Sequence, residues 1–203
     1  MNQTFKEILL DRRSIRAYKP GIVIEDTLIE SIFKDALRAP SANNLQPWSF
    51  KIIKSPEAKT TYSHLFPWNR KQYETSSFMV ILFVDKSFAK RAKAIYDMQV
   101  NDGTMTIETR DKQLNAFKQT TMADADILRT AYLDAGLVAM SLMLSARSYG
   151  LDTCPIGGFL KRESEQAFEV TDQEAVMAIS FGIKDEDGHQ TLRLPFHDVA
   201  SIY

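Results

Sequence analysis

The sequence of 203 residues predicts one domain that mixes helices and strands. Apolar residues recur at helical spacing over 28–37 and 124–149, whereas residues 78–84 form an uninterrupted apolar run of strand length. Because helices and strands alternate along the chain, a doubly wound nucleotide-binding fold is one alternative. However, no G-x-G-x-x-G segment follows any expected strand, so the fingerprint of that fold is missing.

Charge and cysteine content limit the class of protein. The chain has 25 basic and 26 acidic side chains, a net charge of -1, which gives no reason to expect nucleic acid or an anionic membrane as a partner. The single cysteine, Cys154, excludes an intramolecular disulfide, and the 3 histidines show no zinc-type spacing. No apolar stretch has the length of a signal peptide or a bilayer span. We therefore expect a soluble, cytoplasmic protein that binds no metal.

Spacing and capping residues predict the elements of the first half. Thr4 and Glu7 form a capping-box pattern, Pro40 ends the second helix, and Ser55 precedes a proline at the first turn of a third. We expect, in order, a helix over 4 to about 11, a helix over 28–37, a strand starting at 48 and a helix opening at 55.

The second half contains the expected core. The run 78–84 is apolar on both faces, which is typical of a central strand. The helix over 124–149 is apolar nearly all round between 135 and 146, which predicts a buried central helix, and Gly150 follows as its C-terminal cap. Four further segments are expected: a polar helical stretch over 86 to about 122 broken at Gly103, a short helix over 161–168, a strand over 175–183, and an extended tail.

The tail, residues 184–203, carries Leu194, Phe196, Val199 and Ile202 without a strand or helix register. Apolar side chains on a long extension need a surface to bury against. Our hypothesis is that the tail wraps onto a second copy of the chain.

A cluster of donors follows the first helix. Arg12, Arg13, Ser14 and Arg16 offer guanidinium groups and a hydroxyl within five residues, a set that suits a phosphate and the oxygen-rich edge of a heterocycle. The alternative is a basic surface turn that forms ion pairs with solvent-exposed neighbours.

A second polar segment lies between two prolines. Pro40, Ser41, Asn44 and Gln46 belong to an irregular stretch that ends at Trp48, and its composition suits the sugar and phosphate of a cofactor. A turn that caps its own backbone is the alternative, and Trp48 itself is expected in the core.

These two motifs resemble those of the flavin-mononucleotide-dependent nitroreductase family, an RxS-x-R/K element followed by a PS-x-x-N-x-QPW element. The segments 152–159 (DTCPIGGF) and 192–195 (LRLP) extend the similarity, which runs from about residue 4 to about residue 199. The resemblance implies an α+β fold with a mainly antiparallel sheet between helices. It also implies an intertwined homodimer, a flavin in each interface, and a single domain over 1–203 whose tail reaches the partner.

The resemblance also assigns roles to the first two motifs. It implies that Arg12 holds the FMN phosphate, with Arg13 beside it, while Ser14 and Arg16 reach the ribityl chain and the pyrimidine edge. A fixed cation at Arg16 would stabilise the negative charge that develops near N1 and O2 of a reduced flavin. Pro40, Ser41, Asn44 and Gln46 would contact the flavin held mainly by the other subunit.

Three later groups complete the expected site. Asn69 and Gln72 match an element that faces the flavin carbonyls and N3; some relatives have lysine at the second position, so we expect a lower flavin potential here. The other residues that the resemblance implies for the cofactor are Pro155, Ile156, Gly157 and Gly158, along one face with a backbone N–H donating to N5, and Arg193, closing over the phosphate. Glycine permits the close approach. The alternative for Asn69 and Gln72 is a pair of exposed amides at a helix end. The alternative for residues 155–158 is an ordinary turn, and that for Arg193 is a surface arginine.

The function that follows is reduction of nitroaromatics, quinones or similar flat electrophiles by hydride transfer from NADH or NADPH through FMN, with ping-pong kinetics. No residue of the protein is expected to react covalently, since the cofactor carries the chemistry. Two alternatives are a flavin-dependent reductase of activated C=C bonds, with Cys154 or a residue of 86–122 as proton donor, and a flavin-binding sensor or storage protein with low turnover.

Overall fold

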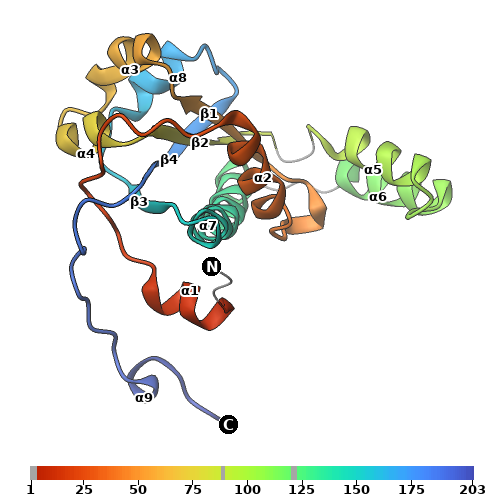
Figure 1. Ribbon diagram of the computed structural model, residues 1–203. Coiled ribbons are helices and arrows are strands. Elements are labelled where there is room, and N and C mark those ends of the chain that lie inside the picture. The colour runs from red at the N-terminus through yellow and green to blue at the C-terminus, as the bar shows by residue number, and fades with distance from the viewer. Residues whose placement is uncertain (1–3, 88–89, 120–122) are drawn as a thin grey trace.

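A four-stranded antiparallel sheet lies at the centre of the fold, in the order β1-β2-β4-β3 (Figure 1). The computed structural model describes residues 4–87, 90–119 and 123–203. The strands are β1 (Trp48–Ile53), β2 (Phe78–Asp85), β3 (Asp152–Ile156) and β4 (Gln173–Gly182). The α+β class with an antiparallel sheet is thus confirmed, and the doubly wound parallel alternative is wrong.

Helices cover both faces of the sheet. The helices are α1 (Phe5–Asp11), α2 (Asp26–Ala36), α3 (Pro56–Tyr62), α4 (Arg70–Thr75), α5 (Ala92–Asn101), α6 (Ile107–Gln119), α7 (Asp124–Ser148), α8 (Lys161–Ala167) and α9 (Phe196–Val199), with 3-10 turns η1 (Ala42–Asn44) and η2 (Ser63–Leu65). Alternate residues of β2 point to opposite faces: Val80 and Leu82 pack with α2 and α7, whereas Met79 and Ile81 pack on the side of α4.

Local signals located the helix ends correctly. Thr4 and Glu7 form the expected capping box at α1, and the Ser55 hydroxyl accepts from the Ala58 N–H at the start of α3. Gly150 has a φ of +82°, as a glycine after a helix C-terminus requires.

Strand β3 and helix α4 are among the elements that were not predicted. Strand β3 contains Pro155, which cannot donate to a sheet ladder; it is tolerated because β3 is an edge strand, paired with β4 alone among the described strands. The six-residue helix α4 is too short to show a helical repeat.

Helix α7 is the central helix, but it is buried on one side only. Ala135, Val138 and Leu142 are fully buried against the sheet, whereas Leu133 is 68% and Leu137 47% exposed. The expectation of burial all round is therefore corrected. Ala125–Ser148 is long and apolar enough to cross a membrane by length and composition, a test that a core helix also passes. Packing on the sheet accounts for the apolar composition of its inner side.

The polar stretch expected over 86 to about 122 forms a helical hairpin, α5 and α6, that projects from the main body (Figure 1). Gly103, with a φ of +77°, lies between the two helices. Residues 88–89 and 120–122 of this expected stretch lie outside the described residues.

The tail first runs beside the segment after α1 and then extends away from the sheet (Figure 1). Its start pairs through Lys19 N–H to Ile183 O at 2.8 Å and Asp185 N–H to Ala17 O at 3.0 Å. Beyond this the one-turn helix α9 is the only regular element among the described residues of the tail. Its large exposed apolar side chains are Leu192, Leu194, Phe196, Val199, Ile202 and Tyr203.

Candidate functional site

The arginine segment is brought against strand β3. Arg12 caps the C-terminus of α1, and its N–H donates to Ile8 O at 3.1 Å. The chain then passes alongside β3, where Ile15 N–H donates to Thr153 O at 3.2 Å and Ser14 forms a parallel bridge with Thr153. A helix end and a strand edge thus fix the position of the cluster.

The guanidinium groups of the cluster are used differently. Nη1 of Arg12 is buried and has no hydrogen-bond partner within the described structure. Arg13 instead turns back and donates to Leu10 O and Arg12 O. Arg16 is exposed; its backbone N–H donates to Glu186 Oε1 at 2.6 Å and its Nη1 lies 3.4 Å from Ser14 O. A buried, unpaired charged donor is costly, so Arg12 has the environment of a group that awaits an anionic acceptor.

The glycine pair follows β3 directly. Gly157 and Gly158 are exposed, and an added Cβ at either position would meet no atom within 4 Å. Nδ2 of Asn69 donates to Gly158 O at 2.7 Å, which orients the peptide after Gly158. The pair therefore leaves open space where side chains would otherwise lie, with Pro155 and Ile156 leading up to it on β3.

A buried polar network lies behind this surface. Gln72 is 4% exposed and its Nε2 donates to Ser180 Oγ at 2.6 Å. The hydroxyls of Tyr18 and Ser180 lie 2.7 Å apart, and Ser180 Oγ lies 3.4 Å from Cys154 O. Tyr18 and Ser180 were missed because their partners are distant in sequence.

Cys154 is buried, as expected for a small core residue. Burial raises the pKa of its thiol, while hydrogen bonding to Gln72, the charge of Arg16 and a hydrogen bond to Ser14 act in the opposite direction. The same pKa effects place the arginine segment, Gln72 and Cys154 in one neighbourhood. Three of the five expected groups therefore converge: the arginine segment, Asn69 with Gln72, and residues 155–158. The 40–46 loop and the tail arginine are not among them.

The 40–46 loop lies elsewhere in the chain. It follows α2, lies beside α5 and leads into β1, at the opposite edge of the sheet from β3 and the arginine segment (Figure 1). Pro40 and Asn44 are exposed, Ser41 Oγ accepts from Gln46 N–H at 3.0 Å, and Gln46 Nε2 lies 3.2 Å from Asn44 Oδ1. One chain alone does not bring this loop to the glycine pair.

In the described structure Arg193 forms no hydrogen bond with the other residues expected at the site. It is exposed on the tail, and its Nη1 donates to Thr191 Oγ1 at 2.7 Å and Leu192 O at 3.0 Å. Its hydrogen bonds within the described structure are therefore local to the tail.

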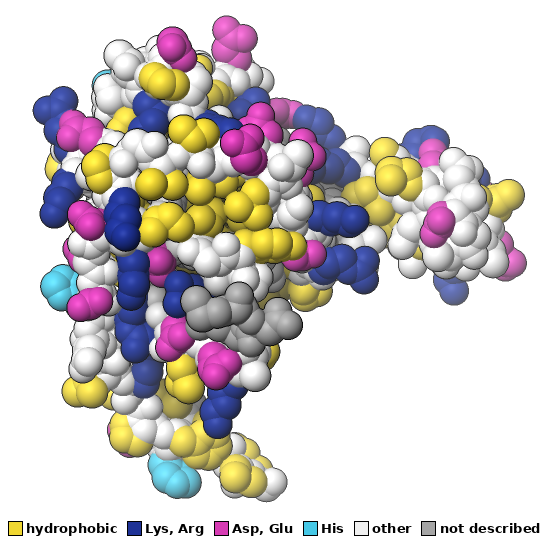
Figure 2. Space-filling view, in the orientation of Figure 1, with side chains coloured by type: hydrophobic (Ala, Val, Ile, Leu, Met, Phe, Trp, Pro, Cys, Tyr) yellow, Lys and Arg dark blue, Asp and Glu magenta, His cyan; other side chains and the backbone are white. Residues whose placement is uncertain are grey.

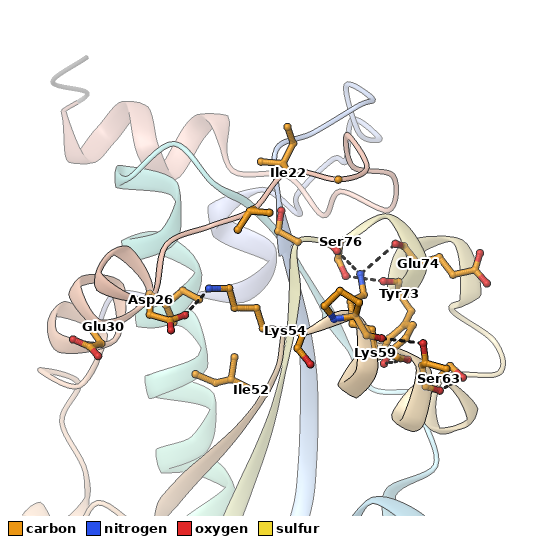
Figure 3. Close-up of a pocket in the computed structure, with 17 residues that line it drawn as sticks. Ile22, Asp26, Glu30, Ile52, Lys54, Lys59, Ser63, Tyr73, Glu74 and Ser76 are labelled. Atoms are coloured by element: carbon orange, nitrogen blue, oxygen red, sulfur yellow. Dashed lines mark hydrogen bonds and ion pairs between the residues drawn. The ribbon is translucent and has the colours of Figure 1, made fainter.

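The surface charge and the hollows of the molecule show where ligands could lie. Figure 2 shows a row of Lys and Arg side chains down one side of the molecule and apolar side chains gathered in the middle of this face. A separate cavity of about 1060 Å³ lies along the free edge of β1 (Figure 3). Its lining includes the Lys54–Asp26 ion pair, with Nζ and Oδ1 2.5 Å apart, and Lys59, whose ammonium donates to Glu74 O and Ser76 O. None of the residues expected to hold the cofactor lines this cavity.

The residues of the arginine segment and the glycine pair fit FMN by their chemistry. An unpaired buried guanidinium and neighbouring hydroxyl suit its phosphate and ribityl chain, and open space beside two glycines suits close approach of a flat ring.

Comparison with known proteins gives a consistent result. Residues 9–183 match the family described as "Nitroreductase family". The chain is 38% identical over 200 residues to "Putative NAD(P)H nitroreductase YdgI" of Bacillus subtilis (strain 168), with 97% of this chain and 96% of that protein covered. It is 27% identical over 198 residues to the CLA biosynthesis enone reductase of Lactiplantibacillus plantarum, with 95% and 91% covered. A crystal structure from Exiguobacterium sibiricum 255-15, described as a "putative nitroreductase in complex with FMN", superposes with a TM-score of 0.95 at 37% identity, covering 99% of this chain and 98% of that one.

Proposed function

This chain belongs to the nitroreductase family, a family of oxidoreductases, and on that premise we propose that it is an FMN-dependent NAD(P)H oxidoreductase acting on nitroaromatics, quinones or similar flat electrophiles. The single observation that carries the proposal is the buried Nη1 of Arg12, which has no partner in the described structure and belongs to the segment that runs alongside β3, the strand that leads to the glycine pair.

The arginine segment is assigned to the charged part of the cofactor. Arg12 would bind the phosphate, with Ser14 and Arg16 contacting the ribityl chain and the pyrimidine edge. Arg13 would contribute its charge rather than a direct contact to the phosphate, since its guanidinium donates to the carbonyls of Leu10 and Arg12. A cation held at Arg16 stabilises negative charge on the ring edge.

The second group would hold the ring. Asn69 fixes the peptide that joins Gly158 to Phe159, which restrains the backbone at the end of the glycine pair. A backbone N–H of the glycine pair would donate to the ring. Gln72, whose amide is locked by Ser180, presents its remaining polar atoms in one orientation. Bound FMN would accept hydride from the nicotinamide and pass it to the acceptor, and the chain supplies a slot that the two substrates enter in turn.

We propose that the site is completed by a second copy of the chain. The loop with Pro40, Ser41, Asn44 and Gln46 leads into β1 at one edge of the sheet, whereas the arginine segment of the same chain lies against β3 at the other edge (Figure 1). The outer face of α7 and the tail both carry exposed apolar side chains, such as Leu133 at 68% and Leu192 at 99%. Burying them against a second copy would remove apolar area from water and bring the loop to the partner's cofactor.

A second activity is supported by one relative. The enone reductase of Lactiplantibacillus plantarum suggests reduction of activated C=C bonds, which needs a proton donor near the substrate. Cys154 is a poor candidate for this donor because its side chain is buried.

Spectroscopy and kinetics test the proposal. Purified protein should show the absorbance of bound flavin, or take up FMN after removal of the cofactor, and should bleach on anaerobic mixing with NADH or NADPH. Steady-state velocities with a quinone or a nitroaromatic should give parallel double-reciprocal lines. Protein that binds no FMN refutes the assignment, and intersecting lines refute the shared slot. Flavin that stays oxidised with both nicotinamides favours a sensor or storage protein, and faster reduction of an enone favours the second activity.

Solution mass tests the assembly. The full chain should sediment at twice its 23.1 kDa mass, and a chain ending at residue 189 should dissociate more readily. An unchanged dissociation constant for the shortened chain would remove the tail from the interface.

A further inference from the structure

The 40–46 loop has a backbone that ordinary side chains rarely adopt. Asn43, Asn44 and Gln46 have φ values of +51°, +56° and +47°, all in the left-handed region. Such a backbone conformation is strained and persists only where the surrounding structure holds it. Asparagine tolerates this region better than most residues, but glutamine does not. The loop therefore needs anchors.

One anchor comes from the central helix. Asp134 on α7 is 4% exposed, and its carboxylate accepts from Ala42 N–H, with Oδ1 at 3.1 Å and Oδ2 at 3.2 Å. Because this buried carboxylate is bonded to a backbone N–H of the loop, it fixes the first turn of the loop against α7.

Two anchors come from the hairpin. The Tyr96 hydroxyl on α5 donates to Asn43 O at 3.1 Å, and Nη1 of Arg91 donates to Gln46 O at 3.1 Å and Trp48 O at 2.8 Å. Arg91 is itself held by an ion pair at 2.9 Å with Asp85, whose side chain is 2% exposed.

The hairpin and the loop also share an apolar contact. Leu45, 1% exposed, packs with Ala92 and Tyr96, and it is the one member of this buried cluster that comes from the main body. The loop is thus one of the places where the projecting hairpin meets the rest of the molecule (Figure 1).

We propose that Asp134, Arg91 and Tyr96 are positioning residues that hold the side chains of Asn44 and Gln46 in place for the cofactor. The backbone N–H groups of Ala42 and Gln46 and the carbonyls of Asn43 and Gln46 are bonded to protein side chains. In contrast, Asn44 is exposed and its amide is paired with that of Gln46. The loop offers side-chain amides to a ligand and keeps its backbone rigid. A displacement of the hairpin changes the positions of Asn44 and Gln46, and hence the affinity for FMN, through Arg91 and Tyr96. The proposal rests on the function proposed above.

FMN binding to apoprotein, followed by flavin fluorescence, tests it without any turnover. Tyr96→Phe and Asp134→Ala each remove one anchor, and each should weaken FMN binding about three- to tenfold, the effect of one lost hydrogen bond. Asp134→Asn keeps an acceptor for Ala42 N–H and should bind within about twofold of the parent. Tyr149→Phe is the matched control, because its hydroxyl bonds Asp35 Oδ2 at 3.0 Å and touches no part of the loop.

The urea midpoint of each apoprotein separates positioning from general stability. Three results together support the proposal. Tyr96→Phe binds FMN more weakly than the parent, its urea midpoint equals that of Tyr149→Phe, and Asp134→Asn restores the FMN affinity that Asp134→Ala loses. Parent-like binding by both Tyr96→Phe and Asp134→Ala overturns it, as does equal weakening by Tyr149→Phe. If the parent apoprotein takes up no FMN, the proposed function fails first. Should Asp134→Ala not fold, Tyr96→Phe against Tyr149→Phe decides the question.

Discussion

Removing the hydroxyl of Ser180 should destabilise the protein far more than its size suggests. Ser180 is fully buried, and its Oγ is the shared partner of the Gln72 amide at 2.6 Å and the Tyr18 hydroxyl at 2.7 Å. In Ser180→Ala, the Gln72 amide loses its acceptor at a cost of about 1–3 kcal/mol. The Tyr18 hydroxyl keeps only its longer contact to Ser180 O at 3.3 Å, which costs about 0.5–1.5 kcal/mol more.

The predicted sum, about 2–4 kcal/mol, is measured by urea unfolding followed by circular dichroism. Ser31→Ala is the control, because its hydroxyl bonds Thr27 O on the exposed side of α2 and should change stability by less than about 0.5 kcal/mol. Tyr18→Phe leaves Ser180 with its other partners and should cost about 1 kcal/mol. The double variant should then be more stable than the sum of the single effects, since one orphaned group is gone. Simple additivity, or a cost below about 1 kcal/mol for Ser180→Ala, would refute the network as a structural unit.

Three further outcomes are expected. Arg12→Ala should weaken FMN binding about 10- to 100-fold in a fluorescence titration, the effect of a lost charge-assisted hydrogen bond. The affinity of Arg12→Lys should lie between those of the parent and Arg12→Ala, and Arg129→Ala, at an exposed position, should bind as the parent does. Equal affinities for the parent and Arg12→Ala would remove Arg12 from the site. Gly182→Ala should lower the free energy of unfolding by about 1–3 kcal/mol, because the added Cβ would lie 2.8 Å from Cδ1 of buried Tyr18; a neutral effect would contradict this packing. Burial raises the pKa of the Asp134 carboxyl, so its contribution to stability is full below the unfolded pKa and declines as the pH rises through the folded pKa. Asp134→Asn should therefore gain stability relative to the parent between about pH 3 and 7, and a difference in unfolding free energy that stays constant over this range would contradict the shift.

Much of the fold was predictable because its signals are local. A capping residue lies three positions from its partner, as Thr4 and Ser55 show, and the apolar run of β2 is contiguous. Strand β3 was not predicted because it contains Pro155, a residue that is also compatible with a turn. Only the sheet order shows that β3 is an edge strand, where proline is tolerated.

The site divides in the same way. The arginine segment and the glycine pair were found because each motif is short and carries its own donors. Their supports were not, because the partners lie far apart in sequence: Ala42 and Asp134 are 92 positions apart, and Gln72 and Ser180 are 108 apart. The exposed side of α7 was also missed, since composition does not tell a helix buried on all sides from one with a bare apolar face.

The ion pair between Asp85 and Arg91 constrains how this sequence can drift over time. Asp85 also accepts from Gln173 at 2.7 Å, and Gln173 in turn accepts from Ser49, so the charge is tied to three separate stretches of chain. Replacing Arg91 alone leaves the buried carboxylate of Asp85 without its charged partner, typically at a cost of about 3–5 kcal/mol. Replacing Asp85 alone leaves Arg91, whose side chain is 35% exposed, without the charge that orients it toward the loop. Homologous sequences should accordingly change positions 85 and 91 together or leave both as they are.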